Sequence, residues 1–142
     1  MMRRVLGTTA AVVALAAVAV PSMGTASPAD SGTVAKGKKP TVKVIDDYYS
    51  PQKMTIKQNA VVKFKWDGGN ANSHNVTFVK GPKGVKKSKK PCAGGKVTKC
   101  NVSGTGSIGV NFEPKFDKKG EYEFHCTIHP TVMDIHIKVK GN

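Results

Sequence analysis

The chain has 142 residues, enough for one domain, and its 23 Lys and Arg against 9 Asp and Glu give a formal net charge of +14. Both arginines lie at positions 3 and 4, so the rest of the chain carries lysine alone. Because arginine is the side chain that reads bases and phosphates with a two-pronged contact, this distribution excludes a dedicated nucleic-acid reader. The charge is compatible with acidic partner proteins, a polyanion or a membrane surface, and does not choose among them.

The N-terminal residues have the three parts of a secretory signal peptide. Two arginines form a positive start, residues 10–20 are an unbroken apolar run, and the small residues at 24–26 offer a cleavage point. The apolar run is shorter than the ~20 residues that a membrane span needs. We therefore predict a signal peptide at 1–26 and an exported protein, located in a periplasm, in a cell envelope or outside the cell, that is not inserted in the membrane after cleavage. Residues 27–39 are rich in small residues without periodicity and are predicted to form a flexible leader.

Residues 40–142 are predicted to form a single all-β domain. Apolar and polar residues alternate with the period of half-buried strands in five runs: 41–45, 60–66, 74–79, 120–126 and 134–140. In the clearest of them, Val62, Phe64 and Trp66 face one way and two lysines the other. The domain shows no helical stripe. Short strands separated by Gly, Pro and Asn indicate a β-sandwich or a β-barrel.

Residues 80–107 interrupt this pattern. They are rich in Lys and Gly, poor in large apolar side chains, and contain eight lysines between positions 80 and 99. Cys92 and Cys100 lie on either side of a flexible stretch and are candidates for a disulfide, because an exported protein meets an oxidising environment. We interpret the segment as a solvated surface loop held by that disulfide, and a docking patch for a partner is the alternative.

A third cysteine, Cys126, is left over, and a leftover thiol in an exported protein needs an explanation. It is followed by His129 and Met133, so a thiol, an imidazole and a thioether occur within eight residues. Soft sulfur ligands with imidazole suit copper, and two His with one Cys and a weak axial Met form an electron-transfer copper site. The alternatives are that Cys126 is a buried structural cysteine or that it pairs with Cys92 or Cys100.

Three further histidines are candidates for the second imidazole. His136 lies on the charged side of its predicted strand, and His125 points away from Cys126, so neither is expected to share its metal. His74 stands where a loop enters a strand and is the natural second imidazole. The predicted metal ligands are therefore His74, Cys126, His129 and Met133.

Two motifs are specific because they occur together. They are Ser73-His74-Asn75-Val76-Thr77-Phe78 upstream and, downstream, Gly120-Glu121-Tyr122-Glu123-Phe124-His125-Cys126-Thr127-Ile128-His129-Pro130 followed by Met133. With them the chain resembles the small blue (type 1) copper proteins, the cupredoxins of the plastocyanin and amicyanin kind, from about residue 41 to residue 139. The resemblance implies an eight-stranded Greek-key β-sandwich that holds one type 1 copper per monomer, under the loop that joins the last two strands.

The resemblance also implies a role for each residue of the site. His74, Cys126 and His129 would be the equatorial ligands and Met133 the axial one, while the backbone of Asn75 would bond the thiolate. Three residues separate His129 from Met133, one more than in amicyanin-like loops and one fewer than in plastocyanin-like loops. Loop length sets how closely the thioether approaches the metal. This intermediate spacing therefore leaves open whether Met133 is the axial ligand.

The implied function is one-electron transfer between redox partner proteins by a monomer whose copper cycles between Cu(I) and Cu(II). A copper carrier or scavenger with the same ligands and without redox turnover is the alternative. We do not expect an enzyme, because Thr127 stands where multicopper oxidases have His, no His-x-His pair occurs, and copper nitrite reductases have two domains. A structural zinc site is disfavoured because Met is not among the usual ligands of zinc.

Overall fold

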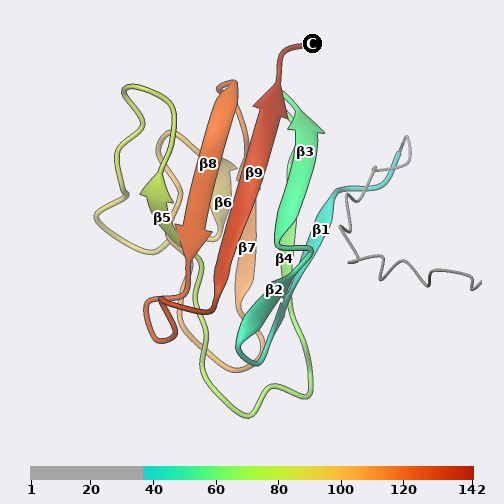
Figure 1. Ribbon diagram of the computed structural model, residues 1–142, viewed down its shortest axis with the longest axis vertical. Helices are drawn as coiled ribbons and strands as arrows, with labels where there is room; N and C mark the ends of the chain where they lie inside the picture. Colours follow the sequence, from blue (N-terminus) through green and yellow to red (C-terminus); the bar gives the residue numbers. More distant parts are fainter. Residues whose placement is uncertain (1–36) are drawn as a thin grey trace, which may run out of the picture.

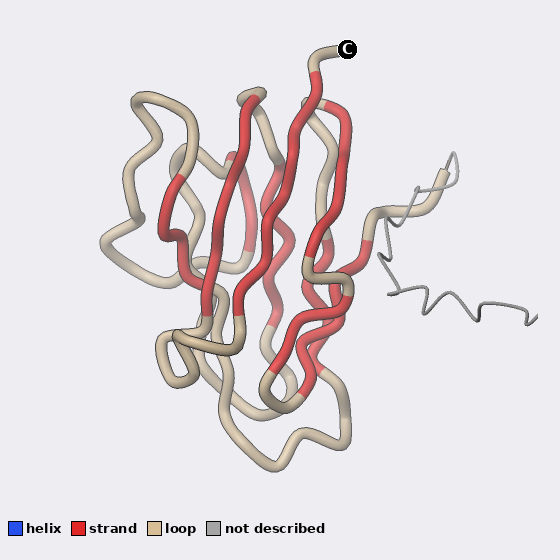
Figure 2. Tube along the Cα trace, viewed as in Figure 1, coloured by secondary structure: helices blue, strands red, loops and turns tan. Residues whose placement is uncertain are grey.

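The structure, a computed structural model, describes residues 37–142 as nine β-strands in two sheets, with no helix in this range (Figure 1, Figure 2). Side chains from both sheets form one core, so the expected all-β sandwich is confirmed. The predicted signal peptide at 1–26 and most of the predicted leader at 27–39 lie outside the described residues. Among the described residues, no helix is long and apolar enough to cross a membrane.

One sheet has five strands and the other has four. The five-stranded sheet contains, in spatial order, β2 (Tyr48–Ser50), β1 (Thr41–Ile45), β4 (Lys63–Trp66), β7 (Asn111–Lys115) and β6 (Gly94–Lys96). The four-stranded sheet contains β3 (Lys53–Lys57), β9 (Asp134–Lys140), β8 (Gly120–His125) and β5 (Thr77–Lys80). The chain changes sheet between β2 and β3, where β3 joins the edge of its sheet in parallel with β9.

Alternating side chains build the core between the sheets. In β4 and the residue before it, Val62, Phe64 and Trp66 are buried while both lysines are exposed, as predicted. The same alternation holds in β8 and β9. The largest buried rings gather in one cluster, which consists of Tyr49, Phe64, Phe112, Phe116, Tyr122 and Phe124. Because aromatic side chains bury the most apolar surface, this cluster supplies much of the hydrophobic stabilisation of the sandwich.

The run at 74–79 differs from the prediction of a regular strand. Strand β5 begins only at Thr77, both Thr77 and Phe78 are buried, and Val79 is exposed. Residues 74–78 are all buried, so burial does not alternate there, and the pairing of β5 with β8 shifts register only afterwards, between Phe78 and Lys80. His74 precedes the strand and pairs with Gly106 in an isolated bridge.

The lysine-rich segment 80–107 is more structured than a surface loop. Its lysines are exposed, as predicted, but the segment contains β6, which pairs in parallel with β7. Val97 and Asn101 are fully buried, and the Asn101 side chain donates to two backbone carbonyls. The disulfide expected between Cys92 and Cys100 is present. The segment therefore has a small interior of its own, organised around Asn101.

Ionisation of Tyr122 couples the stability of the sandwich to alkaline pH. Its phenol donates to the Lys118 carbonyl over 2.7 Å, and burial, with a smaller contribution from Asp117, raises the pKa of Tyr122 to about 12. A tyrosine in the unfolded chain ionises near a pKa of ~10, so the free energy of unfolding is undiminished below that pH and falls as the pH rises toward 12. Denaturant titrations of metal-free protein should show this decrease, and Tyr122→Phe should make it less steep. If the free energy of unfolding fell equally steeply with pH in wild type and in Tyr122→Phe, the expectation would be contradicted.

Candidate metal centre

The candidate site lies at the end of the sandwich where β8 ends and β9 begins (Figure 1). Cys126 directly follows β8, and the loop from Cys126 to Met133 returns the chain to β9. His74 reaches the same end from the loop between β4 and β5, where it pairs with Gly106 in an isolated bridge. His74 and Cys126 are 52 positions apart in the sequence and meet because β5 and β8 are neighbours in one sheet.

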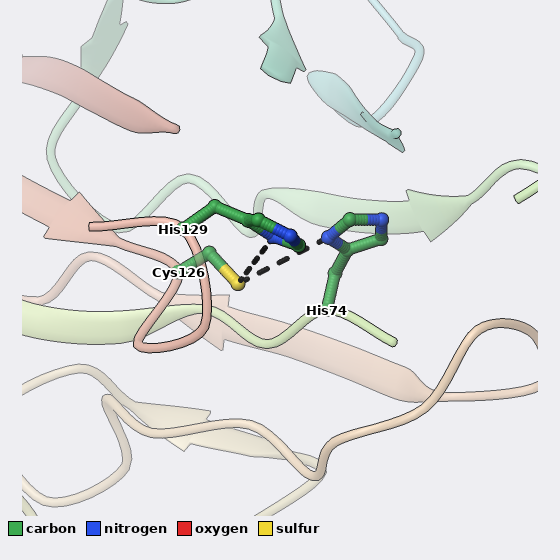
Figure 3. A group of neighbouring side chains, drawn as sticks. All are labelled: His74, Cys126 and His129. Carbon is green, nitrogen blue, oxygen red and sulfur yellow. Dashed lines mark hydrogen bonds between the residues drawn. The ribbon is translucent and has the colours of Figure 1, made fainter. Parts of the chain in front are cut away.

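The donor atoms of His74, Cys126 and His129 converge (Figure 3). They lie within 4.8 Å of one another, and Cys126 Sγ is 4.0 Å from Nδ1 of His74 and 3.9 Å from Nδ1 of His129. A thiolate binds a metal at about 2.3 Å and an imidazole at about 2.0 Å, so two such donors on one ion lie at most about 4.3 Å apart. The two sulfur–nitrogen separations therefore fit a single metal ion bound by the thiolate and both imidazoles.

Backbone contacts hold His74 in place. Its side chain is fully buried, and its N–H and C=O exchange hydrogen bonds with Gly106 at 3.0 and 3.1 Å. The indole N–H of Trp66, which ends β4, donates to the His74 carbonyl over 3.3 Å. These contacts attach the backbone of His74 to both the five-stranded sheet and the loop before β7.

Asp46 contacts the opposite side of this imidazole. Its Oδ1 lies 2.8 Å from Nε2 of His74, and the same carboxylate accepts the backbone N–H groups of Ala71 and Asn72. These hydrogen bonds, with the one from His74 as the largest effect, lower the pKa of Asp46 to about 2. A carboxylate only accepts, so Nε2 carries the ring proton and Nδ1 presents its lone pair toward Cys126.

Asn75 connects Cys126 to its surroundings. Its backbone N–H lies 3.5 Å from Cys126 Sγ, a contact expected from the family resemblance. Its side chain donates to the hydroxyls of Thr105 and Thr127 and accepts the backbone N–H of Thr127 at 2.9 Å. The buried hydroxyl of Tyr49 donates to the Asn75 carbonyl, and burial raises the pKa of Tyr49. The sulfur therefore lies in a hydrogen-bond network that joins three loops.

Backbone hydrogen bonds close the loop that follows Cys126. The N–H of His129 donates to the Cys126 carbonyl, that of Met133 to the His129 carbonyl, and that of Cys126 to the Met133 carbonyl, at 3.2, 3.0 and 3.0 Å. Met133 is fully buried. A loop of this intermediate length thus places the backbone of Met133 within hydrogen-bond distance of both Cys126 and His129.

His129 is the donor of this cluster that solvent reaches. Its side chain is 23% exposed, whereas that of His74 is 0% exposed. Ile128 and Val132, on the same loop, are 48% and 55% exposed. Asp47 places Oδ1 3.5 Å from Nε2 of His129. This imidazole is therefore partly exposed on a loop that also exposes two apolar side chains, and one carboxylate lies beside it.

The other two histidines lie away from the cluster. His125, on β8, is paired with Asp134 of β9, and His136 lies on the exposed face of β9 with Nε2 3.2 Å from the Asp134 carboxylate. Sequence reasoning did not find Asp46 and Asp47 as contacts of the imidazoles. Their place between an apolar run and two tyrosines indicates a turn, and nothing in that pattern points to the metal centre.

Comparison with protein families agrees with this geometry. The model of copper-binding proteins of the plastocyanin/azurin family matches residues 34–140, which is most of the chain. The chain belongs to this family. Copper is accordingly its cofactor, and one thiol with two imidazoles is a donor set that suits copper. No curated protein sequence matches the chain at a significant level.

Several solved structures share the fold. Amicyanin from Paracoccus versutus has 21% sequence identity and a TM-score of 0.51, over 81% of this chain and 86% of the other. A purple cupredoxin from Nitrosopumilus maritimus has 18% identity and a TM-score of 0.52, over 71% and 99%. A copper-containing nitrite reductase from Thermus scotoductus has 23% identity and a TM-score of 0.53, over 75% of this chain and 25% of the reductase. At such identities the similarity shows the cupredoxin fold alone.

Proposed function

We propose that this protein is an exported, monomeric electron carrier with one type 1 copper that alternates between Cu(I) and Cu(II). The proposed ligands are His74, Cys126 and His129, with Met133 as the weak axial ligand. The observation that carries the proposal is the convergence of one thiol and two imidazole nitrogens within 4.8 Å, where His74 meets Cys126 and His129 of a loop that ends in a buried methionine. Two His, one Cys and a weak axial Met are the ligands of electron-transfer copper sites. Export is proposed from the sequence of residues 1–26 alone.

The way these side chains are held suits electron transfer. Bound copper supplies the chemistry, because it accepts and releases one electron. The protein has to keep one geometry for both charge states. His74 and Cys126 are fully buried, the ligand loop is closed by backbone hydrogen bonds, and the N–H of Asn75 points at the sulfur. Such a preformed site has little to rearrange when its charge changes, and the N–H stabilises negative charge on the sulfur.

Electrons pass, in this proposal, through the exposed edge of the His129 ring. His74 and Cys126 are buried, so a partner cannot touch them directly. Ile128 and Val132 are exposed on the same loop as His129. Apolar side chains around the ring favour a close contact from which water is excluded, and closeness is what a short electron path requires.

Charge is distributed unevenly between this end and the rest of the molecule. The loops at the metal end are 46–47, 67–76, 103–110 and 126–133 (Figure 1), and they contain three aspartates and no lysine. Every lysine of residues 37–142 lies outside these four loops. We therefore propose that a redox partner meets an apolar, weakly acidic surface, while the lysines steer acidic partners at longer range.

A carrier accounts for the site better than an enzyme does. A catalytic metal keeps one coordination position open for its substrate. Here the fourth proposed donor, Met133, is fully buried. His125, which stands next to Cys126 where a second copper ion could be bridged, is not among the converging donors of the described residues.

The second candidate is a copper carrier or scavenger that uses the same donors without redox turnover. The partial exposure of His129 favours it, because a donor at the surface gives copper a way in and out. Both candidates require the same fold and the same donors, so geometry does not separate them.

Spectroscopy and voltammetry of the copper-loaded protein distinguish the two candidates. For an electron carrier we expect one copper per chain, an intense visible band from charge transfer between the thiolate and Cu(II), and a reversible one-electron wave. The physical reason is that a preformed site binds both oxidation states without a change of ligands. A colourless protein that retains only Cu(I) would refute electron transfer and support the carrier or scavenger.

A further inference from the structure

Two adjacent aspartates in the turn between β1 and β2 each face one of the two imidazoles. Asp46 Oδ1 lies 2.8 Å from Nε2 of His74, and Asp47 Oδ1 lies 3.5 Å from Nε2 of His129. Both rings point their other nitrogen, Nδ1, at Cys126 Sγ. One turn, which is remote in sequence from either histidine, therefore contacts the far side of both rings.

The backbone of the turn explains how neighbouring side chains reach the same region. Strand pairing ends with Ile45 opposite Tyr48, so only Asp46 and Asp47 form the turn. Successive side chains in a regular strand point to opposite faces. Asp47 instead adopts a φ of 66°, in the left-handed region, which aspartate tolerates better than most residues. This conformation lets both carboxylates approach the imidazoles.

The two contacts differ in strength. The Asp46 carboxylate also accepts the backbone N–H groups of Ala71 and Asn72 at 2.7 and 3.1 Å, so it is fixed before it meets the buried ring of His74. Asp47 is 61% exposed, and its contact with His129 is longer. Solvent screens an exposed pair, so the Asp46 contact is the stronger of the two.

We propose that Asp46 and Asp47 are positioning residues that hold both imidazoles with Nδ1 toward the copper and lower its reduction potential. The inference rests on the ligand set proposed above. A carboxylate that accepts the outer N–H of a ligating imidazole selects the tautomer and raises the basicity of the ring. Its negative charge also stabilises Cu(II) more than Cu(I), because Cu(II) carries the larger positive charge. Asp46 has the larger effect and Asp47 the smaller one.

The test compares five variants of the mature protein, one of which, Asp46→Glu, keeps the carboxylate on a longer side chain. Asp46→Asn and Asp47→Asn remove a charge next to an imidazole, and Asp46→Ala also removes the acceptor. Asp67→Asn is the matched control, because Asp67 lies at the same end but its carboxylate accepts the Gly69 N–H at 2.9 Å instead of an imidazole N–H. The measurements are the affinities for Cu(II) and Cu(I), the reduction potential, and the ¹⁵N resonances of His74 in metal-free protein.

Asp46→Asn should weaken Cu(II) binding by about 10–100-fold, the usual loss when an outer hydrogen-bond partner of a ligand is mutated. Cu(I) binding should weaken less. Each tenfold difference between the two losses raises the potential by about 59 mV for one electron. Asp47→Asn should raise the reduction potential less than Asp46→Asn does, and Asp67→Asn should raise it least. In metal-free Asp46→Ala, the ¹⁵N spectrum should show His74 shifting from the single Nε2–H tautomer to a mixture, and Asp46→Glu should restore the potential in part.

Equal potential shifts in Asp46→Asn and Asp67→Asn would overturn the inference, since the effect would then be general surface charge. An unchanged His74 tautomer in Asp46→Ala would overturn it as well. Failure of the wild-type protein to bind copper would refute the proposed function instead, and the ¹⁵N spectra of metal-free protein would still decide whether Asp46 sets the tautomer.

Discussion

The Cys126→Ser variant is expected to lose the intense visible absorption of the copper-loaded protein completely and to bind copper more than ~100-fold more weakly. The colour depends on a thiolate bound to Cu(II), and a serine hydroxyl stays protonated and lacks the soft sulfur donor. Cys126 is fully buried and serine is close to it in size, so the variant should fold. Absorption and paramagnetic resonance spectra of the copper-loaded variant check the expectation.

The chain offers a control for this experiment, because its other two cysteines form a disulfide. Replacing Cys92 and Cys100 together by serine should leave the colour intact, since neither sulfur belongs to the cluster of donors. That variant should lose only stability, about 2–3 kcal/mol for a short disulfide loop. A coloured Cys126→Ser protein, or a colourless double variant that is still folded, would contradict the proposed ligand.

Phe124→Ala is expected to lower the free energy of unfolding by about 3–5 kcal/mol, the largest effect on stability that we expect from one substitution. Phe124 is fully buried, and its ring lies 5.9 to 6.3 Å, between centroids, from those of Phe64, Phe78 and Phe116. The substitution removes a ring from the centre of this cluster and leaves a cavity that the two sheets cannot close. Denaturant unfolding of the metal-free protein measures the loss.

Two other substitutions calibrate this result. Phe124→Leu keeps most of the volume and should cost less than Phe124→Ala, while Val132→Ala, at a side chain that is 55% exposed, should change stability by less than about 0.5 kcal/mol. Copper should raise the stability of wild type and Phe124→Ala alike, because a ligand that binds the folded state stabilises it. A loss below about 1 kcal/mol in Phe124→Ala would show that the cluster is not the main support of the sandwich.

Much of the fold follows from local patterns. The burial of Val62, Phe64 and Trp66 on one side of β4 is predicted by alternation alone, as is the phase of β8 and β9. These strands are long enough for a period of two to show, and their polar side chains face solvent. Strand β6 could not be predicted in this way. It consists of two glycines and a lysine, all exposed, and exists because β7 supplies its pairing partner.

The candidate metal site likewise combines residues that local sequence patterns indicate with contacts that only strand pairing produces. Cys126, His129 and Met133 are close in sequence, so their spacing alone indicates a metal-binding loop, and the structure brings His129 Nδ1 to 3.9 Å from the sulfur. His74 was selected from the phase of the other histidines and its place at a strand entrance. The convergence with Cys126 itself depends on the pairing of β5 with β8, which the irregular pattern of 74–79 did not reveal.

The amino-acid sequence by itself determined the fold class, the disulfide candidates and the kind of donor atoms, because strand period and residue chemistry are local properties. Only the tertiary structure decided which groups surround those donors. Asp46 and Asp47 meet the imidazoles because the β1–β2 turn, the loop before β5 and the loop after β8 end at one edge of the sandwich. Contacts between loops depend on how the sheets pack, and no period or spacing along the chain encodes them.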